Sequence, residues 1–177
     1  MSWRAVRLVT ETAGDTHALA AALAELAVPG DLLVLSGEMG TGKTTFAQGF
    51  ARGLGIVEAV TSPTFTIVRE YGGGRLALHH LDVYRLDHLH EVADLGLGEM
   101  LDEDAVMVVE WGDAVLPVLG DTYLQVRLGF GGDDDQRRLE LHGCGASWLA
   151  RHRVVSEAVG PWLAGPEPAG TDGAAPC

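Results

Sequence analysis

The sequence predicts an α/β fold, a three-layer sandwich in which helices cover both faces of a central, mainly parallel sheet with added β-hairpins. Three observations support this prediction. A glycine-rich loop, 37–44, follows a short apolar run and precedes a helical pattern. A second apolar run, 105–109, ends in the acid Glu110, and two further pairs of strand-like runs are each joined by a glycine-containing turn. Strands that alternate with helices are typical of parallel sheets covered on both faces.

The glycine-rich loop matches G-x-x-x-x-G-K-[ST], the phosphate-binding P-loop. Gly37 and Gly42 permit backbone dihedrals that are closed to other residues, so successive N–H groups can point at an anion. The helix dipole, the Lys43 ammonium and the Thr44 hydroxyl would add positive potential, a mobile charge and a ligand for Mg²⁺. We therefore expect nucleotide binding and a fold of the P-loop NTPase type. The candidate nucleotide contacts are Glu38, Met39, Gly40, Thr41, Gly42, Lys43, Thr44 and Thr45.

Lys43 is the only lysine of the chain, because the other 11 of its 12 basic residues are arginine. A compact ammonium fits between phosphate oxygens, where a planar guanidinium fits poorly. The alternative is that a chain with 24 glycines produces the motif by accident. The placement of the one lysine disfavours that alternative.

Length and composition predict one domain, residues 1–164, followed by a disordered tail, 165–177, rich in glycine, proline and alanine. No apolar run approaches the roughly 20 residues of a membrane span, and the N-terminus lacks the apolar stretch of a signal peptide. Cys144 and Cys177 make up neither a disulfide framework nor a metal site, which favours a reducing compartment. We therefore expect a cytoplasmic protein that has no membrane contact.

The formal net charge of the chain is −13. A protein that grips nucleic acid by itself needs a cationic stripe, and the only dense basic stretch here is 151–153. A role with RNA would therefore have to come through a partner. The acidity also has a plain alternative explanation, which is solubility.

The first part of the chain is expected to hold two strands and a helix. Alternating apolar residues predict an opening strand over 3–9. Leucines that recur every three or four residues predict a helix that ends near 29–30. Thr12 and Asp15 have the spacing of a capping box, with Asp15 or Thr16 as the expected cap itself. The apolar run 31–36 is the strand that leads into the P-loop.

The helix after the P-loop repeats apolar residues every four positions and is expected to close at Gly53 and Gly55. A loop over 60–65 follows, because Pro63 disfavours helix at Ser62. The elements expected beyond it are a hairpin of 66–71 with 75–81, short helices at 89–93 and near 99–101, the strand 105–109, a second hairpin of 123–128 with 138–141, and a helix over 146–163.

Two acids end apolar strands and are candidates for catalysis. Glu110 follows the most strand-like run of the chain and would hold Mg²⁺ directly or through water. Asp82 could be a second acid, could orient the attacking water, or could be a solvated strand end. The stretch 61–64 could be a switch loop whose hydroxyl reaches Mg²⁺ or the γ-phosphate, or a plain connection. Trp111 is expected in the core.

The class of NTPase is narrowed by composition. The chain contains no asparagine, and its single lysine lies in the P-loop, so the guanine-reading Asn-Lys-x-Asp sequence is impossible. This disfavours a GTPase. A free-standing small-molecule kinase of P-loop type stays open, with Arg69, Arg75 and Arg85 as candidate lid residues.

Four blocks taken together resemble the TsaE (YjeE) family in order and approximate spacing, and the resemblance covers roughly residues 5 to 145. The blocks are Gly37–Phe46, Thr61–Phe65, Leu81–Leu86 and Val109–Trp111. The resemblance implies a bacterial cytoplasmic ATPase that uses ATP and Mg²⁺ and is needed to threonylcarbamoylate the adenosine beside the anticodon in tRNAs reading codons that start with A. It implies TsaB- and TsaD-type partners, with tRNA contacted only indirectly, and ATP hydrolysis that resets the complex.

Carried over position by position, the resemblance assigns phosphate and Mg²⁺ binding to Lys43 and Thr44. It assigns Mg²⁺ binding to Glu110, hydrolysis to Asp82 and the switch to Thr64. Lys43, Asp82 and Glu110 are therefore the expected catalytic residues.

The family also contacts the nucleotide from its N-terminal segment and from the late hairpin. Thr12 and Arg137 are the nearest candidates, although no firm motif marks either region. The helix from residue 146 and the tail depart from the family pattern and carry no functional assignment.

Overall fold

The computed structural model describes residues 2–63, 67–84, 94–102 and 104–165. The strands are β1 (Val6–Thr10), β2 (Leu32–Ser36), β3 (Val68–Tyr71), β4 (Ala77–Asp82), β5 (Ala105–Glu110), β6 (Tyr123–Phe130) and β7 (Arg137–Cys144). The helices are α1 (Ala13–Glu25), α2 (Lys43–Gly53), α4 (Leu97–Asp102), α5 (Leu116–Leu119) and α6 (Ala146–Ala158), with the 3₁₀ turns η1 (Gly112–Val115) and η2 (Gly160–Trp162).

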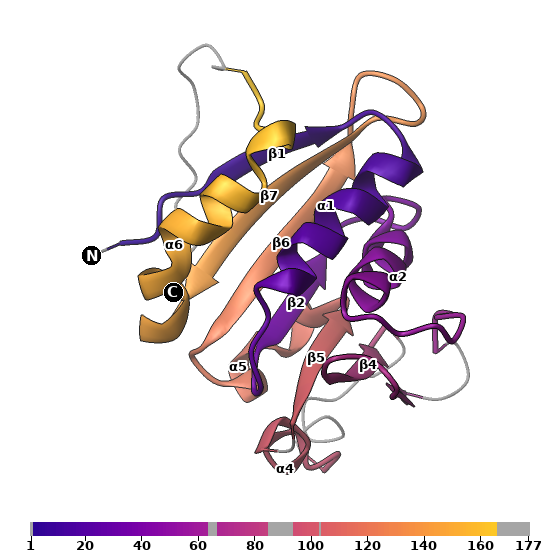
Figure 1. Cartoon of the computed structure of the whole chain (residues 1–177), viewed down its shortest axis with the longest axis vertical. Helices are drawn as coiled ribbons and strands as arrows, with labels where there is room; N and C mark the ends of the chain where they lie inside the picture. The colour runs from indigo at the N-terminus through magenta and orange to yellow at the C-terminus, as the bar shows by residue number, and fades with distance from the viewer. Residues whose placement is uncertain (1, 64–66, 85–93, 103, 166–177) are drawn as a thin grey trace.

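The strands form one sheet in the order β1-β7-β6-β2-β5-β4-β3 (Figure 1). β2 pairs in parallel with β5 and β6, and β4 pairs in parallel with β5. β7 runs antiparallel between β6 and β1, and β3 runs antiparallel to β4. Five strands therefore share one direction, which confirms the mainly parallel sheet and both hairpins. The C-terminal ends of the parallel strands meet at one edge, where β2 leads into the P-loop.

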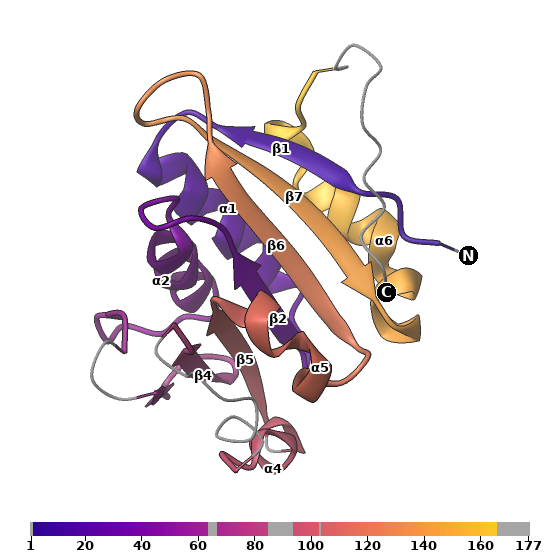
Figure 2. The same ribbon diagram turned by 180° about the vertical axis from the view of Figure 1, so that it is seen from behind.

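Helices pack on both faces of the sheet, but unequally. α1, α2 and α6 lie on one face (Figure 1), over a core to which β1, β2, β5, β6 and β7 all contribute. On the other face the shorter α4, η1 and α5 pack near β2 and β5 (Figure 2). Within the described ranges, that second face carries no helix over β1 and β7 (Figure 2). The three-layer arrangement is thus complete only around the strands that lead to the P-loop.

Two glycines fix how closely α2 packs on α1. A Cβ on Gly49 would lie 2.5 Å from the Cα of His17, and one on Gly53 would lie 2.6 Å from the Cα of Ala21. Gly53 therefore lies inside the last turn of α2 as a packing residue. Gly55, with φ +85°, takes the left-handed conformation that closes the helix, as predicted.

The N-terminal elements differ from the prediction in detail. The N-cap of α1 is Thr12, and neither Asp15 nor Thr16. The Thr12 side chain accepts from the Asp15 N–H at 3.1 Å, and the Asp15 carboxylate accepts from the Thr12 N–H at 3.1 Å, a complete capping box. The opening strand begins at Val6, because Trp3 instead donates its indole N–H to a backbone carbonyl of β7.

The C-terminal helix is shorter than the expected 146–163. α6 ends at Ala158, since Pro161 lacks the N–H that a longer helix needs, and η2 follows as a separate turn. Arg151 of α6 forms a bidentate ion pair with Asp31, with N–O distances of 2.6 and 2.8 Å. Part of the basic stretch noted in the sequence is therefore committed to holding α6 against the start of β2.

Several expectations fall outside the described ranges, namely the helix over 89–93, Thr64 and the tail from residue 166. Cys144 is disulfide-bonded. This differs from the expectation that the cysteines form no disulfide framework, while the cytoplasmic compartment stays a prediction. In the described part of the chain, no helix combines the length and apolar character that a membrane crossing requires.

Candidate nucleotide and metal site

The P-loop connects the C-terminal end of β2 to the first turn of α2 (Figure 1). Gly37, Gly40 and Gly42 have φ values of +141°, +82° and +98°, which L-residues rarely adopt. A Cβ on Gly37 would lie 2.2 Å from the carbonyl oxygen of Leu128 in β6. The loop therefore needs glycine at position 37 both for its backbone conformation and for the close approach of the neighbouring strand.

Gly37→Ala is expected to lower the free energy of unfolding by about 3 kcal/mol or more, because strain and overlap with a backbone oxygen add together. Thermal unfolding and calorimetric ATP titration would measure the loss. Gly72→Ala is the matched control, because Gly72 has nothing within 4 Å of the added Cβ. Equal stability of the two variants would contradict the account of this loop.

Lys43, the first residue of α2, folds its side chain back into the loop. Its Nζ donates to the carbonyl oxygens of Gly37 at 2.7 Å and Glu38 at 2.8 Å. The ammonium is buried, so it occupies the space that the loop encloses rather than solvent. This is a positive group held among fixed dipoles at a helix N-terminus, the arrangement that suits a phosphate.

The surroundings of Lys43 include an aromatic ring and three acids. Nζ lies 3.7 Å from the ring centroid of Trp111, a cation–π distance. Burial lowers the pKa of the Lys43 ammonium, while the charges of Glu110, Asp82 and Asp113 oppose that shift. Two of these three acids, Glu110 and Asp82, are the acids expected near a nucleotide-bound metal.

Thr44 and Glu110 come together from α2 and β5. The Thr44 hydroxyl lies 3.0 Å from each carboxylate oxygen of Glu110, and the Glu110 side chain is 3% exposed. A hydroxyl and a carboxylate are oxygen donors of the kind Mg²⁺ prefers. The residues present thus fit a nucleotide-bound magnesium ion beside the P-loop.

Asp82 lies next to Glu110, because β4 and β5 pair in parallel with these two residues in register. One Asp82 oxygen accepts from the Ser62 hydroxyl at 2.9 Å, and the other accepts from the Tyr84 N–H at 3.0 Å. Asp82 is therefore a half-buried, hydrogen-bonded residue beside the second acid and not a freely solvated strand end.

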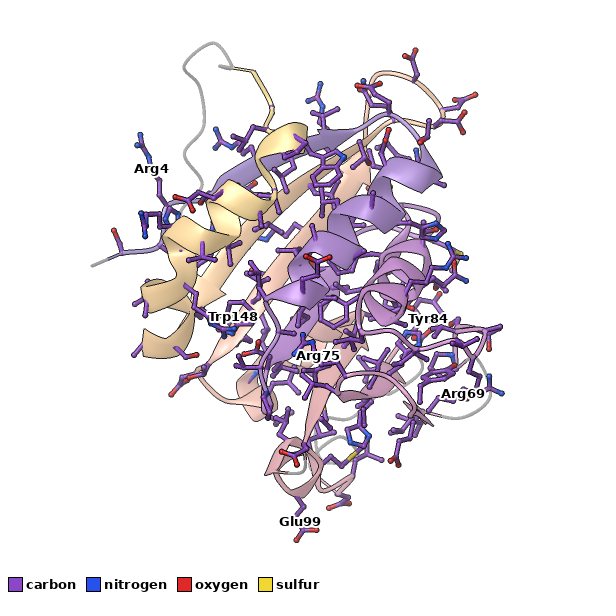
Figure 3. All side chains as sticks on the ribbon, viewed as in Figure 1. Arg4, Arg69, Arg75, Tyr84, Glu99 and Trp148 are labelled. Carbon is purple, nitrogen blue, oxygen red and sulfur yellow. The ribbon has the colours of Figure 1, made fainter. Side chains whose placement is uncertain are left out.

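The stretch before residue 64 is tied to the same site. Ser62 reaches Asp82, and the Thr61 hydroxyl accepts from Arg69 at 2.6 Å. Arg75 instead donates to backbone carbonyls at the C-terminal end of α1, at 2.6 and 2.9 Å, away from Arg69 (Figure 3). Arg75 is thus wrong as a lid residue, because capping α1 occupies its guanidinium; Arg85 lies outside the described ranges.

The two candidates outside the motifs both lie beside the P-loop region. Arg137 starts β7, and its Nη2 lies 3.4 Å from the Gly40 carbonyl oxygen. Thr12 caps α1, and the residue before it, Glu11, accepts from the Gln136 side chain at 3.0 and 3.2 Å. The structure therefore gathers the β1–α1 junction and the β6–β7 turn at the same edge of the sheet.

The other predicted P-loop contacts vary in exposure. Met39 is 67% exposed, and Glu38 and Gly40 are also exposed. Thr41 is buried and donates its hydroxyl to the Glu38 carbonyl at 2.8 Å, so its side chain supports the loop from inside. Thr45 is half-buried in the first turn of α2.

Trp111 packs against the core, as predicted, but it also contacts the site. It is only partly buried, its ring faces Lys43, and Tyr84 packs on it with ring centroids 4.9 Å apart. Its φ of +61° makes it the one non-glycine residue with positive φ in the described ranges. Such strain is characteristic of functional sites. The sequence did give one indication of this position. The tryptophan comes directly after the acid that ends β5, and a residue there lies at the edge of the sheet rather than inside it.

His80 is the second residue that sequence reasoning missed. It is 0% exposed, and its Nε2 lies 2.8 Å from Glu110 Oε1. His79 and His80 are neighbours in β4, so their side chains point to opposite faces of the sheet. Because side chains alternate along a strand, His80 lies on the same face of β4 as Asp82, two residues later. This two-residue spacing was the only feature of the sequence that could have indicated a role for His80.

Comparisons with known proteins show the family of the chain. Residues 10–139 match the family described as threonylcarbamoyl adenosine biosynthesis protein TsaE. A Bacillus subtilis protein described as tRNA threonylcarbamoyladenosine biosynthesis protein TsaE is 44% identical over 162 residues, which cover 88% of this chain and 98% of the relative. A Streptomyces coelicolor protein with the same description is 44% identical over 132 residues, 71% of this chain and 88% of the relative.

The fold has a solved counterpart as well. The crystal structure of YdiB from Bacillus subtilis superposes with a TM-score of 0.74 at 36% sequence identity, covering 91% of this chain and 97% of that one. The family match spans most of the chain, and the relatives are similar over most of their own length. The chain therefore belongs to the TsaE family.

Proposed function

We propose that this protein is a Mg²⁺-dependent ATPase of tRNA threonylcarbamoyladenosine biosynthesis, acting in the cytoplasm with TsaB- and TsaD-type partners. Family membership and the descriptions of the relatives support the pathway. The observation that carries the ATPase assignment is the cluster of Lys43, Thr44 and Glu110, where a buried ammonium, a hydroxyl and a carboxylate meet at a P-loop. The formal net charge of −13 does not favour direct tRNA binding, so the proposal assigns contact with tRNA to the partners.

The roles of the residues follow from their contacts. Lys43, already surrounded by loop carbonyls, would exchange them for phosphate oxygens, and the loop N–H groups would hold the same phosphates. Thr44 and Glu110 would hold Mg²⁺, which when bound neutralises charge on the phosphates. Asp82 would accept a hydrogen bond from the attacking water once its contact with Ser62 is released.

Slow hydrolysis by the isolated protein is expected because two arginines described near the site, Arg69 and Arg137, are held by other groups. Arg69 is bound to Thr61, and Arg137 donates to the backbone carbonyls of Asp134 and Gln136 at 2.6 and 2.8 Å. An arginine that contacts the transition state is worth about 10³–10⁵ in rate. The missing group would come from a partner.

Steady-state ATPase assays test this proposal. We expect weak turnover by the protein alone and a rise of several orders of magnitude with TsaB- and TsaD-type proteins. A third series adds a panel of small phosphoryl acceptors, which a free-standing kinase would require. Stimulation by an acceptor together with indifference to the partner proteins would replace the proposed function with the kinase alternative.

A further inference from the structure

His80 is the part of the site that the proposed function leaves without a role. It lies in β4, two residues before Asp82, with its side chain fully buried. Its Nε2 contacts Glu110 Oε1 at 2.8 Å, and no hydrogen-bond partner for its Nδ1 occurs in the described part of the structure. The ring is thus buried with a single polar contact, made to the acid expected at the metal.

The hydrogen-bond network assigns the tautomer of this histidine. An ionised carboxylate only accepts hydrogen bonds, so the contact with Glu110 requires a hydrogen on His80 Nε2. A neutral ring then carries no hydrogen on Nδ1, which avoids burying a donor that has no acceptor. His80 therefore acts on Glu110 as a hydrogen-bond donor through Nε2.

The two oxygens of Glu110 are not equivalent. Oε1 is contacted by His80 and by the Thr44 hydroxyl, while Oε2 is contacted by the Thr44 hydroxyl alone. That hydroxyl has one hydrogen to donate, and Thr44 is itself an expected Mg²⁺ ligand. Of the two residues described in contact with the carboxylate, Thr44 is an expected ligand of the ion and His80 is not.

We propose that His80 is a positioning residue of the Mg²⁺ site. Its Nε2–H holds Oε1 of Glu110 and leaves the second oxygen with acceptor capacity for the ion or its waters. The inference rests on the proposed roles of Glu110 and Thr44. Residues that orient a metal-binding carboxylate in this way typically change metal affinity by about 10- to 100-fold when they are replaced.

The chain offers a matched control one residue away. His79 lies in the same strand, is 2% exposed and has both ring nitrogens without a hydrogen-bond partner in the described structure. Because side chains alternate, it points to the opposite face of the sheet from His80. Replacing His79 therefore measures the effect of losing a buried histidine from β4 without touching Glu110.

The experiment measures ATP affinity by calorimetry in excess Mg²⁺ and in EDTA. The readout is the Mg²⁺ enhancement, which is the affinity in Mg²⁺ divided by the affinity in EDTA. His80→Leu is expected to reduce the Mg²⁺ enhancement by about 10-fold or more while affinity in EDTA stays at the wild-type value. His80→Gln, whose amide reaches the position of Nε2, is expected to keep most of the enhancement. His80→Asn, whose amide is too short, is expected to lose it, and His79→Leu is expected to keep it.

An unchanged Mg²⁺ enhancement in His80→Leu, or an equal loss in His79→Leu, would overturn the proposal. If His80→Leu does not fold, the Gln and Asn variants decide, and equal enhancement in the two would overturn it as well. A wild-type protein whose ATP affinity ignores Mg²⁺ would instead refute the proposed function, and this inference with it.

Discussion

Lys43→Ala is expected to raise the dissociation constant of ATP by about 10- to 150-fold. The change removes the ammonium that lies among the P-loop carbonyls, and a hydrogen bond to a charged group is worth about 1.5–3 kcal/mol. No second lysine exists in the chain to replace it. Calorimetric titration with MgATP measures the effect directly.

Two further variants define what Lys43 supplies. Lys43→Arg is expected to bind almost as weakly as the alanine variant, because the space between two carbonyls and the Trp111 ring is shaped for an ammonium. Arg52→Ala removes a cation from the other end of α2 and is expected to change nothing. Unaltered affinity in Lys43→Ala would remove the basis of the nucleotide assignment.

Asp82→Asn is expected to reduce turnover by about 100-fold or more and to leave the dissociation constant of MgATP near the wild-type value. An interaction made only in the transition state has this signature, and a positioned acid or base contributes about 10²–10⁴ in rate. Glu110→Gln is expected to weaken Mg²⁺-dependent binding as well as turnover, since Glu110 is the acid beside Thr44. Binding and single-turnover hydrolysis, measured in the presence of the partner proteins, separate the two acids.

Asp113→Asn is the control for charge alone, because Asp113 also raises the pKa of Lys43 but is exposed in η1. It is expected to retain both binding and turnover. The reverse pattern, with Asp82 governing Mg²⁺-dependent binding and Glu110 only turnover, would mean that the roles of the two acids are exchanged.

Most of the fold could be predicted, because its elements are marked by local patterns. The apolar runs around Val34 and Val108 have no polar face, which identifies buried parallel strands, and glycine-containing turns mark both hairpins. Element ends were less accurate. Thr12 rather than Asp15 caps α1, and the C-terminal helix ends before Pro161. The end of a helix depends on single side chains, and other residues that could end it lie within one turn.

The site was predictable where one motif contains all the contacts, and not where strands bring residues together. Lys43 and Thr44 follow from the P-loop alone. The pairing of β4 with β5 places both Asp82 and His80 beside Glu110, and His80 contacts the Glu110 carboxylate. The sequence of neither strand predicts the register of that pairing. Trp111 was missed for a related reason, since its contact with Lys43 requires a backbone conformation that bulky residues rarely adopt.

The strand order has a consequence for how this chain is made. In the described sheet β1 pairs with β7, and its residue Thr10 lies opposite Arg137, so β1 meets this partner only after most of the domain has left the ribosome. β2 likewise remains an edge strand until β6 arrives, and Gly37 packs against β6. Contacts between residues so distant in sequence slow folding. We therefore expect the loop over residues 37–44 to reach its final conformation only late in synthesis, after β6 has been made.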